Sequence, residues 1–182
     1  MKFNLFSKKK YRNSVLSLYT KIVKQARSEC FYTLYGVPDT VTGRFDLITL
    51  HMYIVLRRLK ELGAEGSVLS QDLFDIMFAD MDKNMREMGV GDLRVGKKVK
   101  ELAKAFYGRI KAYDNGISGL NNDTLGNSIK RNIFSDLRPD EKQVRAIEIY
   151  LMREIKESSK WSFTDIENNN ILFTPVKADD NV

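Results

Sequence analysis

The stretch from Gly43 to Gly63 constrains the fold most, because nearly every residue between Phe45 and Leu56 is apolar. A helix that is apolar on all sides must be surrounded by other elements. The run is about twelve residues long, which is short of the ~20 residues that a membrane-spanning helix needs and long for a buried strand. The sequence therefore predicts a buried central helix at about residues 44–62 of an all-α fold.

The composition indicates one ordered domain. With 182 residues, of which 43% are hydrophobic, the chain is large enough to bury about 70% of its unfolded surface. The single cysteine, Cys30, excludes an internal disulfide and suits a reducing compartment. No apolar run reaches transmembrane length, and the N-terminus lacks the hydrophobic region of a signal peptide. We therefore expect a cytoplasmic protein.

Apolar residues at i, i+3 and i+4 spacings predict the other helices. We expect six to seven helices in a single domain, packed around the central one. Those besides the central helix run over about residues 9–28, 67–88, 92–113, 125–133 and 139–155, with a short aromatic segment at 31–35 and a last short turn at 162–165. The predicted organisation is a basic and apolar N-terminal arm at 1–10, a helical domain at 11–176 and a disordered tail at 177–182.

Polar residues before these helices are the expected N-caps. Asp39 or Thr42 is expected to cap the central helix, Ser67 or Ser70 the third helix, and Asp92 the fourth. The stretch from Ser162 to Asp165 resembles a capping box. The segment Ile171–Phe173 is expected to pack in an irregular or extended form.

The net charge of +6 is unevenly distributed. Residues 1–30 carry eight Lys or Arg against one Glu, residues 64–95 carry three against seven acids, and residues 96–114 carry six against two. Basic regions of this kind suit phosphates or an anionic membrane, and equally suit plain solubility. The arm is a candidate membrane contact or a frayed terminus; the residues that would touch the membrane are Phe3, Phe6, Lys8, Lys9 and Lys10.

No catalytic or metal-binding pattern is convincing. Gly91–Lys98 matches the front of a phosphate-binding loop, but Lys98 stands where that loop needs a Ser or Thr. His51 is the only histidine, and we interpret it as a hydrogen-bonded core residue. The carboxylates Asp72, Asp75, Asp80 and Asp82 suit a solvated helix face better than a metal site. We therefore expect no enzyme, no cofactor and no metal.

The methionines of the third helix leave two interpretations open. Its apolar stripe is either an adaptable surface for a client peptide or, more simply, part of the core. The stripe comprises Leu69, Leu73, Ile76, Met77, Met81, Met85 and Met88.

The sequence resembles the ubiquinol–cytochrome c chaperone family, the assembly factors of the cytochrome bc1 complex. The similarity covers about residues 28–150, and the last 30 residues show no recognisable family motif. Within the family, the short form looks like a bacterial member. The residues that carry the resemblance are Phe31–Tyr32, Tyr35–Thr40, Gly43–Leu47, His51, Leu56–Leu59, Leu73–Phe74, Phe78, Met81–Asp82, Met85–Asp92 and Val95–Lys100.

The resemblance implies a helical, non-catalytic factor that receives newly made cytochrome b, or another bc1 subunit, and promotes its assembly. In mitochondrial members a small partner protein takes part, close to the ribosome and the inner membrane. The same contacts, including one with an anionic membrane or the ribosome, are expectations here. The family similarity concentrates at two turns, which gives a candidate partner or client surface of Asp39, Arg44, Asp92, Arg94, Lys97 and Lys98.

Four alternatives stay open, two about the candidate surface and two about the class of function. Asp39 and Asp92 are either part of this surface or simple helix caps, and Arg44 and Asp46 either pair inside the fold or face a partner. A basic, ribosome- or RNA-associated binding protein is the alternative function, although no RNA-binding motif is present and no specific nucleic-acid recognition is expected. An enzyme whose acid–base pair is hidden among the 24 carboxylates is the third class.

Overall fold

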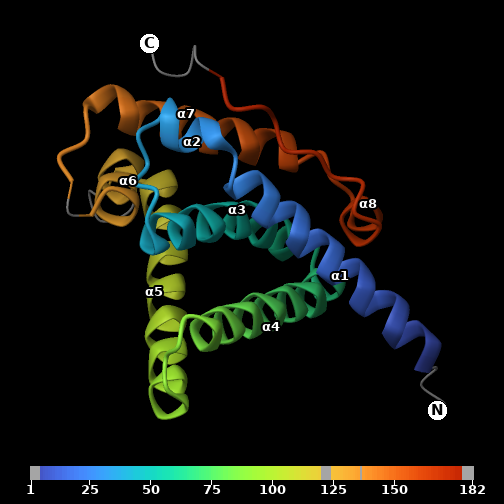
Figure 1. Cartoon of the computed structure of the whole chain (residues 1–182). Helices are drawn as coiled ribbons and strands as arrows, with labels where there is room; N and C mark the ends of the chain where they lie inside the picture. Colours follow the sequence, from blue (N-terminus) through green and yellow to red (C-terminus); the bar gives the residue numbers. More distant parts are fainter. Residues whose placement is uncertain (1–4, 120–123, 136, 178–182) are drawn as a thin grey trace.

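The computed structural model describes residues 5–119, 124–135 and 137–177, with side chains from Asn13 onward, and its regular secondary structure over these residues is entirely helical. This confirms the predicted all-α class. Figure 1 shows the helices, which are α1 (Leu5–Ala26), α2 (Glu29–Thr33), α3 (Val41–Glu61), α4 (Ala64–Glu87), α5 (Asp92–Ser118), α6 (Leu125–Ile133), α7 (Glu141–Ser158) and α8 (Phe163–Glu167).

Helix α3 is the central helix that the apolar run predicts. It packs against α1, α4, α5, α6 and α7, and every residue from Phe45 to Val55 is buried. The helix begins at Val41, three residues earlier than expected. Its N-cap is Thr40, whose hydroxyl accepts a hydrogen bond from the Gly43 amide at 3.1 Å, so the caps predicted at Asp39 and Thr42 are wrong.

Two glycines allow backbones to approach α3 closely. A side chain at Gly43 would overlap the carbonyl oxygen of Pro38, which belongs to the turn between α2 and α3. A side chain at Gly66 in α4 would overlap the carbonyl oxygen of Leu59 in α3. Glycine at these positions therefore fixes the turn onto α3 and lets α4 fold back tightly against it.

Helices α4 and α5 form a hairpin that closes a triangle with α3 and ends at the lower edge of the molecule in Figure 1. The N-cap of α4 is Gly63, and Ser67 and Ser70 lie within the helix, where their hydroxyls donate to carbonyls one turn back. Asp92 is the first residue of α5, after the N-cap Gly91, and makes no capping bond. The predicted serine and Asp92 caps are therefore wrong.

Most of the methionine stripe on α4 belongs to the core. Leu69, Leu73, Met77 and Met85 are buried, while Ile76 and Met81 are partly buried against the core. Only Met88, at the end of α4, is largely exposed. The stripe thus supports the core interpretation, with its last residue left at the surface.

The N-terminal part of α1 extends beyond the body of the molecule in Figure 1. The helix begins at Leu5, earlier than the predicted start at residue 9, and ends at Ala26. Residues 5–10 of the predicted arm therefore have helical backbone continuous with α1, whereas Phe3 lies outside the described residues.

The C-terminal part of the chain folds back over α1 and α7. Ser162 and Asp165 form the predicted capping box at the start of α8. Residues 168–177, which we call the C-terminal strap, have no regular secondary structure and run back alongside α7 (Figure 1). Ile171 in the strap is buried and Phe173 packs against the core, so the irregular packing predicted for Ile171–Phe173 is confirmed. Of the predicted tail, only Lys177 lies within the described residues.

Candidate interaction surfaces

His51 is a core residue with both ring nitrogens engaged. Its Nδ1 lies 2.7 Å from the Leu47 carbonyl oxygen, and its Nε2 lies 2.8 Å from the Tyr150 hydroxyl. Burial lowers its pKa from 6.5 to about 4, so the imidazole is neutral at physiological pH. The structure supports the interpretation of His51 as structural.

Arg44 and Asp46 do not pair with each other. Arg44 forms a two-pronged hydrogen-bonded ion pair with Asp39 on the surface, with N–O distances of 2.7 and 3.2 Å. Asp46, only 1% exposed, instead forms an ion pair at 2.7 Å with Arg109 of α5. Burial raises the pKa of Asp46 to about 6, and the Arg109 guanidinium opposes that rise. Asp46 therefore serves the α3–α5 contact, while Arg44 remains accessible to a partner.

The six residues predicted as one surface lie in two separate places. Asp39 lies in the α2–α3 turn and Arg44 in the first turn of α3, and Leu34 and Val41, on the two sides of this turn in the sequence, are exposed as well. We call these four residues the turn patch. The other four lie at the end of the α4–α5 hairpin, which Figure 1 places at the lower edge of the molecule, away from the α2–α3 turn. They are Asp92, Arg94, Lys97 and Lys98.

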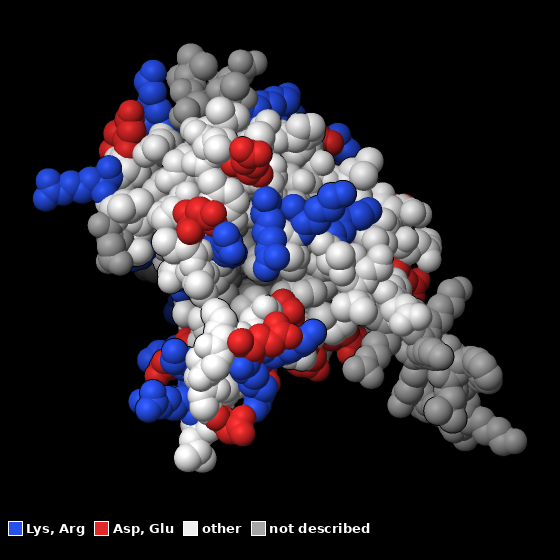
Figure 2. Space-filling view, viewed as in Figure 1, with Lys and Arg blue, Asp and Glu red and all other residues white. Residues whose placement is uncertain are grey.

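The end of the hairpin also exposes two apolar side chains, of which Met88 was predicted as part of the α4 stripe and Leu93 was missed by sequence reasoning. We define the hairpin tip as Met88, Leu93, Arg94, Lys97 and Lys98. Leu93 is 99% exposed and Met88 is 59% exposed, although Leu93 lies beside the buried Val95. Periodicity places Leu93 off the core face of α5, and an apolar residue on that polar face was the available signal. Figure 2 shows this end of the hairpin as uncharged atoms bordered by basic and acidic ones.

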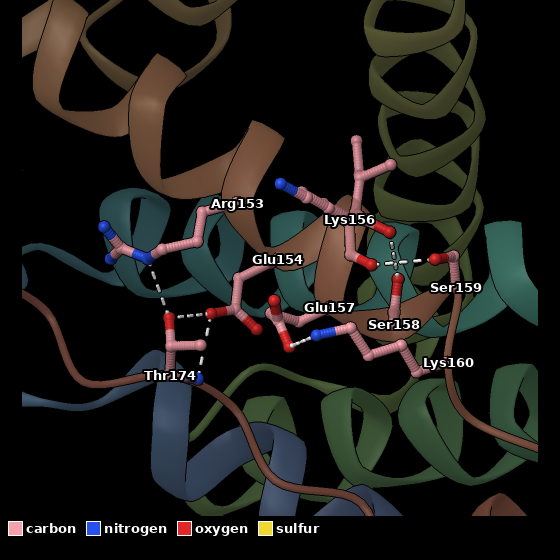
Figure 3. Close-up of polar contacts among 9 residues, drawn as sticks. Arg153, Glu154, Lys156, Glu157, Ser158, Ser159, Lys160 and Thr174 are labelled. Carbon is pink, nitrogen blue, oxygen red and sulfur yellow. Dashed lines mark hydrogen bonds and ion pairs between the residues drawn. The ribbon is translucent and has the colours of Figure 1, made fainter.

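The strap is held to α7 through a buried carboxylate. Glu154 is fully buried, and its Oε1 accepts hydrogen bonds from the backbone amide of Thr174, at 2.9 Å, and from the Thr174 hydroxyl. Arg153 donates to the same hydroxyl at 2.9 Å, as Figure 3 shows. Burial raises the pKa of Glu154, and the Thr174 hydrogen bonds oppose the rise. Sequence reasoning missed this contact because Glu154 and Thr174 come from different segments.

Two shallow grooves open on α5. One of about 450 Å³ lies between α3 and α5 and includes Tyr53, Arg57 and Asp114. The other, of about 380 Å³, lies between α5 and α6 and includes Arg109 and Arg131. Arg57 donates to both Tyr53 and Asp114, and Arg109 pairs with Asp46, so these charges contribute to helix packing.

Features of catalysis or membrane insertion do not emerge from the described parts of the chain. Across them, three or more His, Cys, Asp or Glu side chains nowhere gather as a metal-binding group. Gly91–Lys98 is an N-cap followed by helix, which differs from a phosphate-binding loop after a strand. None of the described helices combines the length and apolarity needed to cross a membrane.

The fold and these two exposed surfaces, the turn patch and the hairpin tip, define the molecule as an all-helical binding protein. A family model described as ubiquinol-cytochrome C chaperone matches residues 33–173. The chain belongs to this family, which confirms the resemblance seen in the sequence. The match extends past residue 150 through most of the strap, so the expectation that the last 30 residues lack family features was wrong up to residue 173.

Individual relatives agree. The chain is 28% identical over 152 residues to mouse ubiquinol-cytochrome c reductase complex assembly factor 1, covering 83% of this chain and 51% of that protein. It is 23% identical to the Xenopus laevis protein of the same name, covering 83% and 75%. The chain thus spans about half the length of the mouse relative. A solved structure, the Cbp3 homolog from Brucella abortus, superposes with a TM-score of 0.81 at 31% identity over 93% of both chains.

Proposed function

We propose that this chain is a non-catalytic chaperone for assembly of the ubiquinol–cytochrome c reductase (bc1) complex, with newly made cytochrome b as its client. The observation that carries the proposal is the similarity over nearly the whole helical fold to a bacterial structure of the family, together with relatives named as assembly factors of that complex. The proposal that the protein is not a catalyst is supported by His51, Asp46 and Glu154. Their pKa values are shifted, but each side chain is engaged in a contact inside the fold.

Loss of the gene tests this function directly. We expect a deletion strain to contain less assembled bc1 complex and less cytochrome b, and the intact gene supplied in trans to restore both. Native gels and haem-b difference spectra measure the two quantities. Unchanged levels in the deletion strain would contradict the proposal.

The turn patch is the proposed contact for the client or for a small partner protein. Val41 is 69% exposed and lies between Asp39 and Arg44 in the sequence, and Leu34, before the turn, is 37% exposed. An apolar centre with a charged border is the usual composition of a protein interface. Thr40 and Gly43 lie among the patch residues in the sequence, and their cap and close packing hold the start of α3 against Pro38 of the turn.

A matched pair of substitutions tests the turn patch. Val41→Asp should reduce recovery of cytochrome b in a pull-down from detergent-solubilised cells at least several-fold, because it places a charge in the apolar centre. Val68→Asp on α4 is the control, since Val68 is 60% exposed and lies outside the patch. Equal recovery with both variants would show that the patch does not contact the client.

We place the protein in the cytoplasm at the inner face of the membrane, with Phe3, Phe6, Lys8, Lys9 and Lys10 as the contact of its N-terminus. Apolar residues followed by a basic cluster suit anionic lipid, where each cation contributes about 1 kcal/mol. Deletion of residues 1–10 should weaken sedimentation with anionic vesicles. Sedimentation equal to that of the full chain would argue for a frayed terminus.

The exposed basic face of α5 favours ribosomal RNA as a second candidate partner. Tyr107 is 58% exposed and stacks on Phe74 with ring centroids 5.4 Å apart, while its neighbour Phe106 is buried. RNA binding that weakens steeply with added salt would support this function. The basic residues of this face are Lys97, Lys98, Lys100, Lys104 and Lys111.

A further inference from the structure

The hairpin tip joins exposed apolar side chains to cations on one surface. Leu93 and Lys97 are four residues apart on α5 and therefore lie on the same helix face, with Arg94 and Lys98 beside them. Met88 is exposed at the end of α4, across the turn. No other described element covers Leu93, which is 99% exposed. The tip therefore offers apolar side chains and basic groups to the same approaching surface.

Three of the four acidic residues near the tip form ion pairs with cations inside the hairpin. Residues 82–101 carry six Lys or Arg against four acids. Asp82 and Asp92 both pair with Arg86, and Glu87 pairs with Lys83 at 3.7 Å. Within the described part of the chain, no ion pair involves the cations of the tip, Arg94, Lys97 and Lys98. These charges are consequently available to an external anion.

We infer that the hairpin tip docks on an anionic lipid bilayer, with Leu93 and Met88 entering the headgroup region and the three cations contacting lipid phosphates. Amphipathic surfaces with apolar and basic side chains bury their apolar part about 5–10 Å into this region. The long stems of Arg94, Lys97 and Lys98 can lie along the apolar layer while their charges stay at the phosphates.

The sign of the charge favours lipid over a membrane-protein loop as the occupant. Cytoplasmic loops of membrane proteins carry an excess of Lys and Arg. On the cytoplasmic side proposed above, such loops would be repelled by Arg94, Lys97 and Lys98, whereas anionic headgroups attract them. The tip is also a projecting end, which fits a flat bilayer better than it would enclose a peptide (Figure 2).

The position of α1 agrees with this orientation. In Figure 1 the hairpin tip and the N-terminal end of α1 both lie at the lower edge of the molecule, at its two sides. A bilayer along that edge meets both, and the turn patch and the strap remain free of it. The tip therefore provides a second membrane contact that also sets the orientation of the molecule.

Vesicle binding by the purified full-length protein tests the inference without any client. The probe is vesicles of phosphatidylcholine and phosphatidylglycerol in equal parts, compared with phosphatidylcholine alone. Replacing Arg94, Lys97 and Lys98 together by Glu should lower the partition coefficient for the mixed vesicles by at least a hundredfold, since each cation near the surface is worth about fivefold. The control with the same change in net charge is Lys60→Glu, Lys111→Glu and Lys142→Glu, which should lower it less.

A matched pair of substitutions tests the contribution of the apolar side chain of Leu93. Leu93→Asp should weaken binding to the mixed vesicles about tenfold or more, whereas Leu172→Asp, 76% exposed on the strap, should not. Both side chains are exposed, so neither variant disturbs the core. Equal loss in the two variants, or none in either, would overturn the inference.

A fluorescent reporter locates the tip itself. Trp161 is the only tryptophan, so Leu93→Trp in a Trp161→Phe background reports from the tip alone. Emission should shift to the blue and become protected from iodide when mixed vesicles are added. An unchanged spectrum overturns the inference, as does loss of client capture in detergent by the triple Glu variant while its vesicle binding is normal. That last result would make the tip a protein contact.

Discussion

At the scale of single residues, His51 links three helices in the centre of the molecule. Gln25 of α1 donates to the Tyr150 hydroxyl of α7 at 3.0 Å. The hydroxyl can then donate to Nε2 of His51, whose Nδ1 donates to the Leu47 carbonyl of α3. This directional chain requires a neutral imidazole with its proton on Nδ1. Protonation of Nε2 would remove the acceptor of the Tyr150 hydroxyl and place a charge in the core.

His51 should therefore make stability sensitive to acid. Its pKa is about 4 in the fold and 6.5 ordinarily, so the unfolded chain binds more protons between these values. The contribution of neutral His51 to the free energy of unfolding is about 3 kcal/mol. It is fully present above pH 6.5 and is lost as the pH falls to 4. The cost of His51→Gln, measured by urea unfolding at several pH values, should shrink as the pH falls.

The difference in the free energy of unfolding between the original protein and the His51→Gln variant isolates the contribution of His51. Asp46 acts in the opposite direction, because its pKa is raised from 3.8 to about 6 and its contribution is lost as the pH rises through 6. Asp46 is present in both proteins, so its contribution cancels in the difference. A cost of His51→Gln that stays constant from pH 7 to pH 4 would contradict the neutral, buried histidine.

At the scale of elements, the contact between α3 and α4 depends on the absence of a side chain. Gly66 is buried where α4 lies against the backbone of Leu59. Elsewhere in a helix, replacing glycine by alanine stabilises by up to about 1 kcal/mol. Backbone contact therefore reverses the usual preference at this one position.

Substitution at two helical glycines should separate packing from propensity. Gly66→Ala should destabilise by about 1–3 kcal/mol, because the new methyl group forces α4 away from α3. Gly108→Ala in α5 is the control, since nothing lies within 4 Å of its new methyl group, and it should be neutral or stabilising. Thermal and urea unfolding measure both. Two stabilising substitutions would mean that the helices are not in backbone contact.

The sequence predicted the helices better than their ends and their partners. The apolar run from Phe45 identified α3 because its burial is needed whatever surrounds it. The cap at Thr40 was missed because Asp39, Thr40 and Thr42 are all good capping types, and only the backbone conformation selects among them. The Asp46–Arg109 pair was missed because a lone carboxylate in an apolar helix does not reveal which distant cation reaches it.

The candidate surfaces were also predictable only in part, because residues far apart in the sequence had to be placed in space. The charges at both turns were readable, but their division into the turn patch and the hairpin tip required the path of α5. Leu93 shows the limit most clearly, since its exposure depends on the hairpin ending beyond the reach of other helices. The sequence places Leu93 off the core face of α5, but it does not show that no other helix covers that face.

At the scale of the whole molecule, the strap connects the C-terminal part of the described chain to α1 and to the α2–α3 turn. Lys21 of α1 donates to the Asn169 and Ile171 carbonyls at 2.7 and 2.8 Å, and the Tyr35 hydroxyl donates to the Lys177 carbonyl at 3.2 Å. Phe173 of the strap packs edge-on against His51, with ring centroids 5.3 Å apart. The strap therefore covers the aromatic core that α3 and α7 share. Detachment of the strap should expose this core to solvent.

Thr174 is the residue at which this attachment is most sensitive. Thr174→Val keeps the shape of the side chain but removes the hydroxyl that donates to Glu154, whose Oε2 is already without a hydrogen-bond partner in the described structure. The loss should destabilise by about 1–3 kcal/mol and raise amide hydrogen exchange across residues 168–177. Thr174→Ser retains the hydroxyl and should leave exchange near its original rate.

Glu154→Gln should destabilise the protein less than Thr174→Val, because the amide oxygen still accepts from Thr174 and no charge is buried. If valine and serine behave alike, the strap is held by Phe173 and the α1 contacts, and the buried carboxylate has no part in closing the fold.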